Sequence, residues 1–393
     1  MKPDTSDFKT PEETAALDSL PSAEPIINKE GEELKMTKKK KFKLSKKQAL
    51  IISGVVVVLL IVGSGAFLIL KPKTSHVIQL QSSIPKVSKP TSNLVPSKLT
   101  GLMVSPSVNK LPITAIMIEN SLAARPQSGL EQAGVVFEAL AEGGITRFMA
   151  LYQSATNPNY IGPIRSARPY FVQWALGFDA DYVHVGGSPL ALSDIQSWNV
   201  KDLNQFYYGS YFTRIPSRVP PHNVYSSMSR LNALENVKGY TSSNFTPWPR
   251  QKPMPLKTPT AANINLTLSN YDYNPSYVYN PKTNTYERSE AGSPQIGTDT
   301  NKQINPSVVI AMITPETNGP LDSSGAYYSV YSNIGSGQAY IFQNGGVQIG
   351  QWNKASNNGP LTFTDASGNP IPFNPGQVWI TAVVANKYVN YTP

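Results

Sequence analysis

The chain has 393 residues, no cysteine and a net charge of +9, from 34 Lys and Arg against 25 Asp and Glu. The absence of cysteine excludes disulfides, thiol catalysis, thiolate metal sites and a lipid-modified N-terminal cysteine. The positive charge does not indicate nucleic-acid binding, because much of it is concentrated in a short lysine block at residues 35–47. Residues 1–34, before that block, are acidic.

Residues 49–70 are the most informative stretch, with 22 uncharged and mostly apolar residues between Lys47 and Lys71. As a helix this stretch is about 33 Å long, enough to cross a bilayer's hydrocarbon core. The lysine block precedes it, so the positive-inside rule predicts a cytoplasmic N-terminus and extracytoplasmic residues 72–393. We therefore expect a single-pass cell-membrane protein whose lysines contact anionic lipid. The alternative, a signal peptide cleaved near residues 64–66, conflicts with the long polar stretch before the apolar core.

The remaining sequence divides by composition. Residues 1–48 are polar and are predicted to be disordered. Residues 71–105 are rich in Ser, Pro, Lys and Thr, which predicts an extended spacer. Two folded domains are expected after the spacer, at residues 106–240 and 262–393, with a proline-rich linker at 241–261.

The first of these domains is expected to mix strands and helices. A glycine pair at residues 143–144 predicts a hairpin between two of its strands. Ser188 can cap a helix that Pro189 opens. The mixture predicts an α+β or α/β domain, with strands at 113–119, 135–142, 145–153 and 181–185, and further helices at 169–178 and 228–237.

The second domain shows no helical period and is expected to be mostly β, a sandwich or a barrel. Turn signals such as residues 280–281 and 344–346 separate its strands. The expected strands are 276–279, 285–289, 307–314, 326–331, 338–343, 347–352 and 376–384.

The predicted hairpin carries the first candidate site. A two-residue turn at 143–144 places Glu138 opposite Met149, and puts Glu138, Glu142 and Arg147 on one face of the sheet. The arginine can simply neutralise both acids. Alternatively, the two carboxylates can bind a cation or sugar hydroxyls, or act as an acid/base pair.

A second candidate site contains Arg165, Ser166 and Arg168, at or just before the start of a predicted helix. Cations there oppose the helix dipole, so an anion between the arginines and the free N–H groups is expected. That anion can be a phosphate, a ligand carboxylate, or Glu138 and Glu142 themselves.

Two polar loops complete the candidates. His184 is followed by a glycine pair and Ser188, which can form an anion-binding nest or an ordinary loop. Arg214, His222 and Asn223 lie in a polar cluster without periodicity, which can either pack against the domain or bind a ligand.

Known catalytic patterns are missing from the sequence. It has no Gly-x-Ser-x-Gly elbow, no zinc-type histidine spacing, and no Walker or dinucleotide glycine pattern. We therefore predict no cofactor and no metal, and the sequence leaves open whether any reaction is catalysed.

Several motifs occur together in one order that resembles the YerB-like lipoprotein family of bacteria, a two-domain module of unknown function. The resemblance covers about residues 100–390. It implies a bacterial envelope setting and no established reaction. A family lipoprotein uses a lipidated cysteine, whereas this chain has an apolar stretch. The motifs are ARPQSGL (124–130), EGGITRF (142–148), IGPIRSARP (161–169), HVGGS (184–188), PHN (221–223), GSGQAY (335–340) and QW (351–352).

The sequence therefore favours an extracytoplasmic envelope protein that binds a cell-wall component or a wall-synthesis partner through the first domain. The alternative is a hydrolase or transferase that acts on an anionic cell-wall glycan. Arginine-rich polarity without a nucleophile–base pair favours binding.

Overall fold

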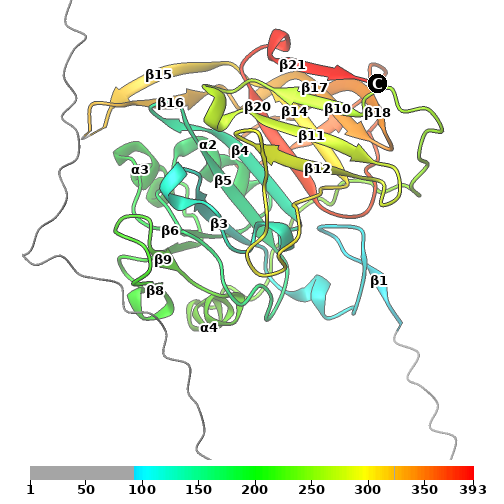
Figure 1. Cartoon of the computed structure of the whole chain (residues 1–393). Helices are drawn as coiled ribbons and strands as arrows, with labels where there is room; N and C mark the ends of the chain where they lie inside the picture. Colours follow the sequence, from blue (N-terminus) through cyan, green and yellow to red (C-terminus); the bar gives the residue numbers. More distant parts are fainter. Residues whose placement is uncertain (1–92, 323) are drawn as a thin grey trace, which may run out of the picture. The chain divides into compact units, whose positions relative to one another are not determined.

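The computed structural model describes residues 93–322 and 324–393 (Figure 1). All of them belong to one compact unit, Val87–Pro393. Most of this unit is β-structure, with a 12-stranded sheet, a 5-stranded sheet and two 2-stranded ribbons. The described part of the chain contains three α-helices, and each of them is short.

The large sheet contains the strands expected from both predicted domains. In spatial order its strands are β19 (Thr362–Thr364), β18 (Gly346–Lys354), β17 (Gly335–Gln343), β14 (Val308–Ile313), β20 (Val378–Val383), β4 (Val135–Glu142), β5 (Ile145–Tyr152), β3 (Thr114–Glu119), β6 (Asp181–His184) and β7 (Asp202–Asn204). β15 (Glu316–Leu321) and β16 (Tyr327–Tyr331) form a hairpin that joins the sheet through β4. β20 pairs in parallel with β14 on one side and with β4 on the other, and so connects the two parts.

The other elements flank this sheet. The 5-stranded sheet has the order β13 (Ser293–Pro294), β12 (Thr285–Glu290), β11 (Pro275–Asn280), β10 (Asn263–Leu266) and β21 (Val389–Thr392). The ribbons are β1 (Val95–Pro96) with β2 (Met103–Val104), and β8 (Thr213–Arg214) with β9 (Val224–Tyr225). The helices are α2 (Pro169–Leu176), α3 (Pro189–Ser197) and α4 (Met228–Lys238).

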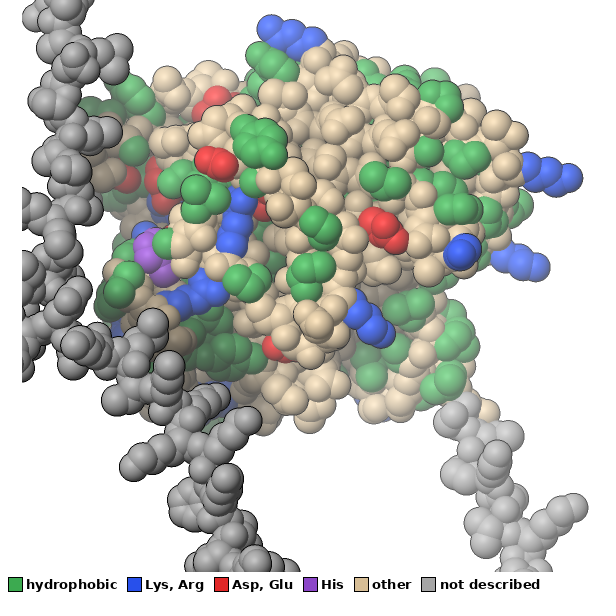
Figure 2. Space-filling model, in the orientation of Figure 1, with side chains coloured by type: hydrophobic (Ala, Val, Ile, Leu, Met, Phe, Trp, Pro, Cys, Tyr) green, Lys and Arg blue, Asp and Glu red, His purple; other side chains and the backbone are tan. Residues whose placement is uncertain are grey.

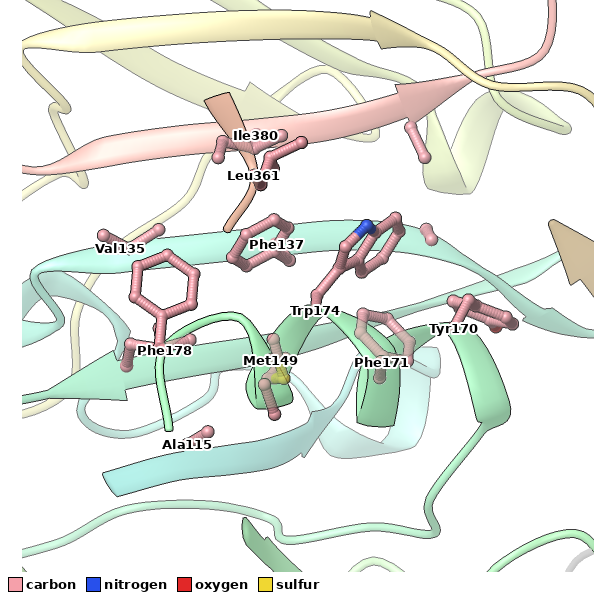
Figure 3. Packing of buried hydrophobic residues seen from close by; sticks show 14 of the residues in the cluster. Ala115, Val135, Phe137, Met149, Tyr170, Phe171, Trp174, Phe178, Leu361 and Ile380 are labelled. Atoms are coloured by element: carbon pink, nitrogen blue, oxygen red, sulfur yellow. The ribbon is translucent and has the colours of Figure 1, made fainter. Parts of the chain in front are cut away.

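One face of the large sheet packs against α2 and α3. The rings of Phe137 from β4 and Trp174 from α2 are stacked, with centroids 5.1 Å apart (Figure 3). Both side chains are buried, together with Phe171 and Met149. Alternate residues of the same strands, such as Val136 and Phe148, face the opposite core.

That opposite core lies between the large sheet, the 5-stranded sheet and α4. Ile264 and Tyr277 of the 5-stranded sheet pack there with Leu231 and Leu234 of α4. The large sheet is therefore covered on both faces, which explains the long apolar runs in its central strands.

The local helix signals are confirmed. Ser188 accepts a hydrogen bond from the Ala191 N–H at the start of α3, and Pro189 occupies the first helical position. α4 begins after the capping residue Ser227 and ends at Gly239, whose φ of 75° suits a glycine.

The predicted fold class was wrong. The described chain is mostly β, with helices of 8, 9 and 11 residues, and not an α+β or α/β domain followed by a β domain. The physical reason is that strands from the C-terminal part, β20 above all, extend the sheet of the N-terminal part. No helix among the described residues is long and apolar enough to cross a membrane.

Several predictions concern residues outside the described range. The tail at 1–48, its lysine block, the membrane-spanning segment at 49–70 and most of the spacer at 71–105 all lie there. The division into domains at 106–240 and 262–393 stays a prediction, and the strands of both parts share one sheet.

Candidate functional site

An extended segment, residues 161–168, brings most of the predicted polar residues together. It crosses the ends of β3 and β6, where the Glu119 N–H donates to the Pro163 carbonyl at 2.9 Å and the Val185 N–H donates to the Arg165 carbonyl at 3.1 Å. The segment therefore lies at one edge of the sheet, with Arg165 close to the end of β3.

Glu142 is the centre of the first charge cluster. One of its carboxylate oxygens pairs with Arg147, and the other pairs with Arg168 at 2.5 Å. Arg147 also donates to the Ser166 carbonyl at 3.0 Å, and Arg168 donates to the Ala167 carbonyl at 2.7 Å. Both guanidinium groups are buried, and Glu142 is nearly so.

The pKa directions agree with this internal pairing. Burial acts to raise the pKa of Glu142, but Arg147 and Arg168 hold it below its ordinary value. Burial and the neighbouring Arg147 lower the pKa of Arg168. Burial also acts to lower the pKa of Arg147, but Glu142, Tyr170 and Glu119 together raise it above its ordinary value. The sequence predicts an anion near the arginines at the start of α2, and Glu142 is the anion that pairs with Arg168 there.

Glu138 lies away from this cluster. A bulge between Leu140 and Glu142 shifts the register, so that Glu138 pairs with Phe148 instead of Met149. Glu138 therefore faces the opposite core and is fully buried there. Its carboxylate forms an ion pair with Arg288 at 2.9 Å. The prediction that Glu138, Glu142 and Arg147 share one face of the sheet is therefore wrong. Glu142 and Arg147 lie together, and Glu138 faces the opposite core.

A second charge cluster forms around Glu119, at the end of β3. The Glu119 carboxylate lies 2.9 Å from Nδ1 of His222, 3.4 Å from Nε of Arg165 and 3.0 Å from the Ser121 hydroxyl. Glu119 is buried, whereas His222 and Arg165 are partly exposed, at 21% and 25%. We call Glu119, His222 and Arg165 the Glu119 cluster.

The geometry of the Glu119 cluster orients the histidine ring. Because the carboxylate accepts from Nδ1, the other ring nitrogen, Nε2, points away from it. Neither Nε2 of His222 nor any side-chain nitrogen of Arg165 has a hydrogen-bond partner among residues 93–322 and 324–393. On the face in Figure 2, a histidine side chain is exposed beside Lys or Arg side chains.

The two clusters are electrostatically linked, because Glu119 is opposite Arg147 in the β3–β5 ladder and its charge acts on that arginine. Together they hold two carboxylates, Glu119 and Glu142, and three guanidinium groups. Two carboxylates and three guanidinium groups leave one positive charge in excess, because Arg147 and Arg168 share the single negative charge of Glu142. Of the three arginine side chains, that of Arg165 is the most exposed.

The other predicted residues lie apart from the two clusters. His184 is fully buried, with Nδ1 at 2.7 Å from the Gly186 carbonyl and Nε2 at 2.8 Å from Asp202. Gly186 has a φ of 58°, and a Cβ there would lie 2.7 Å from the Phe206 ring, so glycine is favoured at this turn. The exposed Arg214 donates to Asn223 at 2.9 Å.

A cavity of about 530 Å³ lies beside the first cluster, between the starts of α2 and α3 and the β15–β16 hairpin. Arg168 and Ser188 line it, but the other predicted site residues do not. Arg168 also covers the ring of Tyr328, at 4.6 Å. The predicted residues thus do not converge in one pocket.

The described residues contain no group of three or more His, Cys, Asp or Glu side chains that could hold a metal ion. Sequence reasoning missed Glu119 and Ser121, which complete the site around His222. Glu119 was assigned only to a buried strand, although an acid at the last position of such a strand is itself a signal for a functional edge.

Comparison with known proteins places this architecture in a family. Residues 99–241 match the N-terminal domain, and residues 264–380 the C-terminal domain, of the family described as "Protein of unknown function (DUF3048)". The chain belongs to the DUF3048 family. The resemblance to YerB-like proteins predicted from the motifs is therefore confirmed.

YerB of Bacillus subtilis is similar to this chain in both sequence and structure. "Putative lipoprotein YerB" of Bacillus subtilis (strain 168) is 33% identical over 302 residues, which are 75% of this chain and 87% of the relative. The crystal structure of YerB from Bacillus subtilis superposes with a TM-score of 0.68 at 31% identity. The match covers 76% of this chain and all of that one.

Proposed function

We propose that this DUF3048 protein works at the outer surface of a bacterial membrane and binds an anionic cell-wall component or wall-synthesis partner through the Glu119 cluster. The location is supported by the relative named as a lipoprotein, since lipoproteins are held at membrane surfaces. The carrying observation is the partly exposed guanidinium group of Arg165, which lies next to the Glu119–His222 pair in a region where three arginines outnumber two carboxylates.

The chemistry of the cluster suits a hydroxylated oxyanion. The guanidinium group of Arg165 can donate two parallel hydrogen bonds to a phosphate or carboxylate. Nε2 of His222 can accept from a ligand hydroxyl while Glu119 holds the Nδ1 proton. Arg147 and Arg168 are not available in this way, because Glu142 and backbone carbonyls occupy them.

One observation favours the alternative, a hydrolase or transferase. Glu119 orients His222, and a histidine held by a carboxylate can also act as a general base. Ser121 does not complete such a site. Its hydroxyl lies 3.4 Å from Nδ1 of His222, on the side of Glu119, and not at Nε2. Binding is therefore the better-supported function.

Thermal melts of the full-length chain test the binding function. Inorganic phosphate at 100 times its dissociation constant should stabilise the chain by about 2.7 kcal/mol, relative to chloride at equal ionic strength. Arg165→Ala should abolish this gain, and His222→Ala should reduce it. Lys282→Ala, which removes an exposed cation in the turn between β11 and β12, is the matched control and should leave the gain unchanged.

A wild-type chain that gains no stability from phosphate or acetate would refute the proposal. So would an Arg165→Ala variant that gains as much as wild type. The alternative is examined by incubating wild type with a phosphorylated trisaccharide, since cleavage that depends on His222 would favour an enzyme over a binding protein.

A further inference from the structure

A second, smaller cavity is lined by residues of the two chain segments that also carry Arg165 and His222 of the Glu119 cluster. It has a volume of about 250 Å³ and is lined by aromatic and polar side chains, among them Asn159, Tyr160, Thr213, Tyr225 and Arg230. None of these residues belongs to the Glu119 cluster, and the family descriptions assign them no role.

The lining of this cavity suits a sugar ring. The rings of Tyr160 and Tyr225 are stacked, with centroids 4.6 Å apart, and Tyr160 remains 37% exposed. An aromatic ring with a polar tip offers an apolar surface for the C–H face of a sugar. Asn159, Thr213 and Arg230 are exposed at the rim, where they can bind the sugar's hydroxyl groups.

The cavity and the Glu119 cluster lie along one antiparallel pair of chain segments. Ile161 pairs with Ser226, and the Ile164 N–H donates to the Val224 carbonyl at 2.7 Å. Tyr160 therefore lies at one end of this pair and Arg165 at the other. Five residues of chain separate them, so their Cα atoms lie no more than about 17 Å apart.

A second cation lies near the cavity. Arg218 belongs to the loop before His222 and donates to the carbonyls of Ala123 and Pro126. Burial raises the pKa of Tyr160 and of Tyr225, and the charge of Arg218 acts on both in the opposite direction. The loop that carries His222 of the Glu119 cluster therefore also brings a positive charge close to the two tyrosines.

We infer that the anionic ligand is a saccharide, with its oxyanion at Arg165 and a sugar ring at Tyr160. This inference rests on the proposed function and adds the ligand's chemical class and its direction along the surface. A single phosphate occupies the Glu119 cluster alone, whereas an oligosaccharide that carries a phosphate at one end reaches both places.

Isothermal titration of the full-length chain with three probes tests this inference: inorganic phosphate, chitotriose and chitotriose 1-phosphate. The phosphorylated trisaccharide should bind at least about tenfold more tightly than phosphate, because its two ends bind as linked groups. Tyr160→Ala should remove that gain and leave the affinity for phosphate unchanged. Tyr160→Phe, the matched control, keeps the ring and should keep the gain.

The outcomes separate this inference from the proposed function. If wild type binds phosphate, but the phosphorylated trisaccharide no more tightly, the saccharide class is wrong and the anion site stands. A Tyr160→Ala variant that keeps the gain also overturns the inference. If wild type binds no phosphate, both proposals fail. Should Tyr160→Ala not fold, Arg230→Ala at the exposed rim should show the same selective loss.

Discussion

Replacing Arg288 by methionine should lower the free energy of unfolding by about 3–5 kcal/mol. Arg288 and Glu138 are both fully buried, and their side chains form an ion pair at 2.9 Å. Methionine keeps much of the packing volume but leaves the carboxylate without its counter-charge. Trp379 remains as a donor to that carboxylate, at 2.9 Å, and does not replace the lost charge.

The magnitude follows from the surroundings of Arg288. Its guanidinium group donates to the Tyr277 hydroxyl at 2.8 Å and lies over the ring of Trp379, at 4.4 Å. Burial acts to lower the pKa of Arg288, but Glu138, Tyr277 and Glu290 together hold the pKa above its ordinary value. The arginine is therefore charged when folded, and its loss exposes the full desolvation cost of Glu138.

Urea unfolding followed by tryptophan fluorescence measures this change. The double variant Arg288→Met with Glu138→Gln should regain about 1–3 kcal/mol over Arg288→Met alone, because the uncompensated charge is gone. A loss below about 1 kcal/mol in Arg288→Met would refute the reasoning. So would a double variant no more stable than the single one.

Two further predictions concern the core and its pH dependence. Trp174→Ala should lower the free energy of unfolding by about 3–5 kcal/mol, measured by chemical denaturation, because the indole is buried against Phe137. The carboxyl groups of Asp181 and Glu235 are in contact, and burial raises the pKa of both above the ordinary values of 3.8 and 4.5. For Asp181, repulsion by the charge of Glu235 is the second cause. The stabilisation from these raised values is complete below about pH 4 and is lost as the pH rises, so Glu235→Gln should flatten the decline in stability between pH 5 and 8.

The elements were predicted well where the pattern is local. The strands around Gly143 and the cap at Ser188 depend on neighbours in the sequence, and both are present in the structure. The fold class failed because it depends on pairing between distant segments. The parallel pairing of Val135 with Val378 leaves no local signal in either strand.

The candidate site shows the same division. The pairing of Glu142 with Arg147 could be predicted, because a hairpin brings them together whatever follows. The place of Glu138 could not, since one bulge after Leu140 turns the residues before it to the other face. The partner of His222 was missed because Glu119 is 103 residues away in the sequence.

The count of charges at the sheet edge gives the strongest reason to expect a ligand. Glu142 accepts hydrogen bonds from both Arg147 and Arg168 through its two oxygens, but its single negative charge leaves one positive charge in excess. Glu119 forms the ion pair of Arg165, at 3.4 Å, and also accepts from His222 and Ser121. A third anion would complete the balance, and Arg165 has the most exposed of the three arginine side chains. We therefore expect this anion to come from outside the chain and to bind at Arg165.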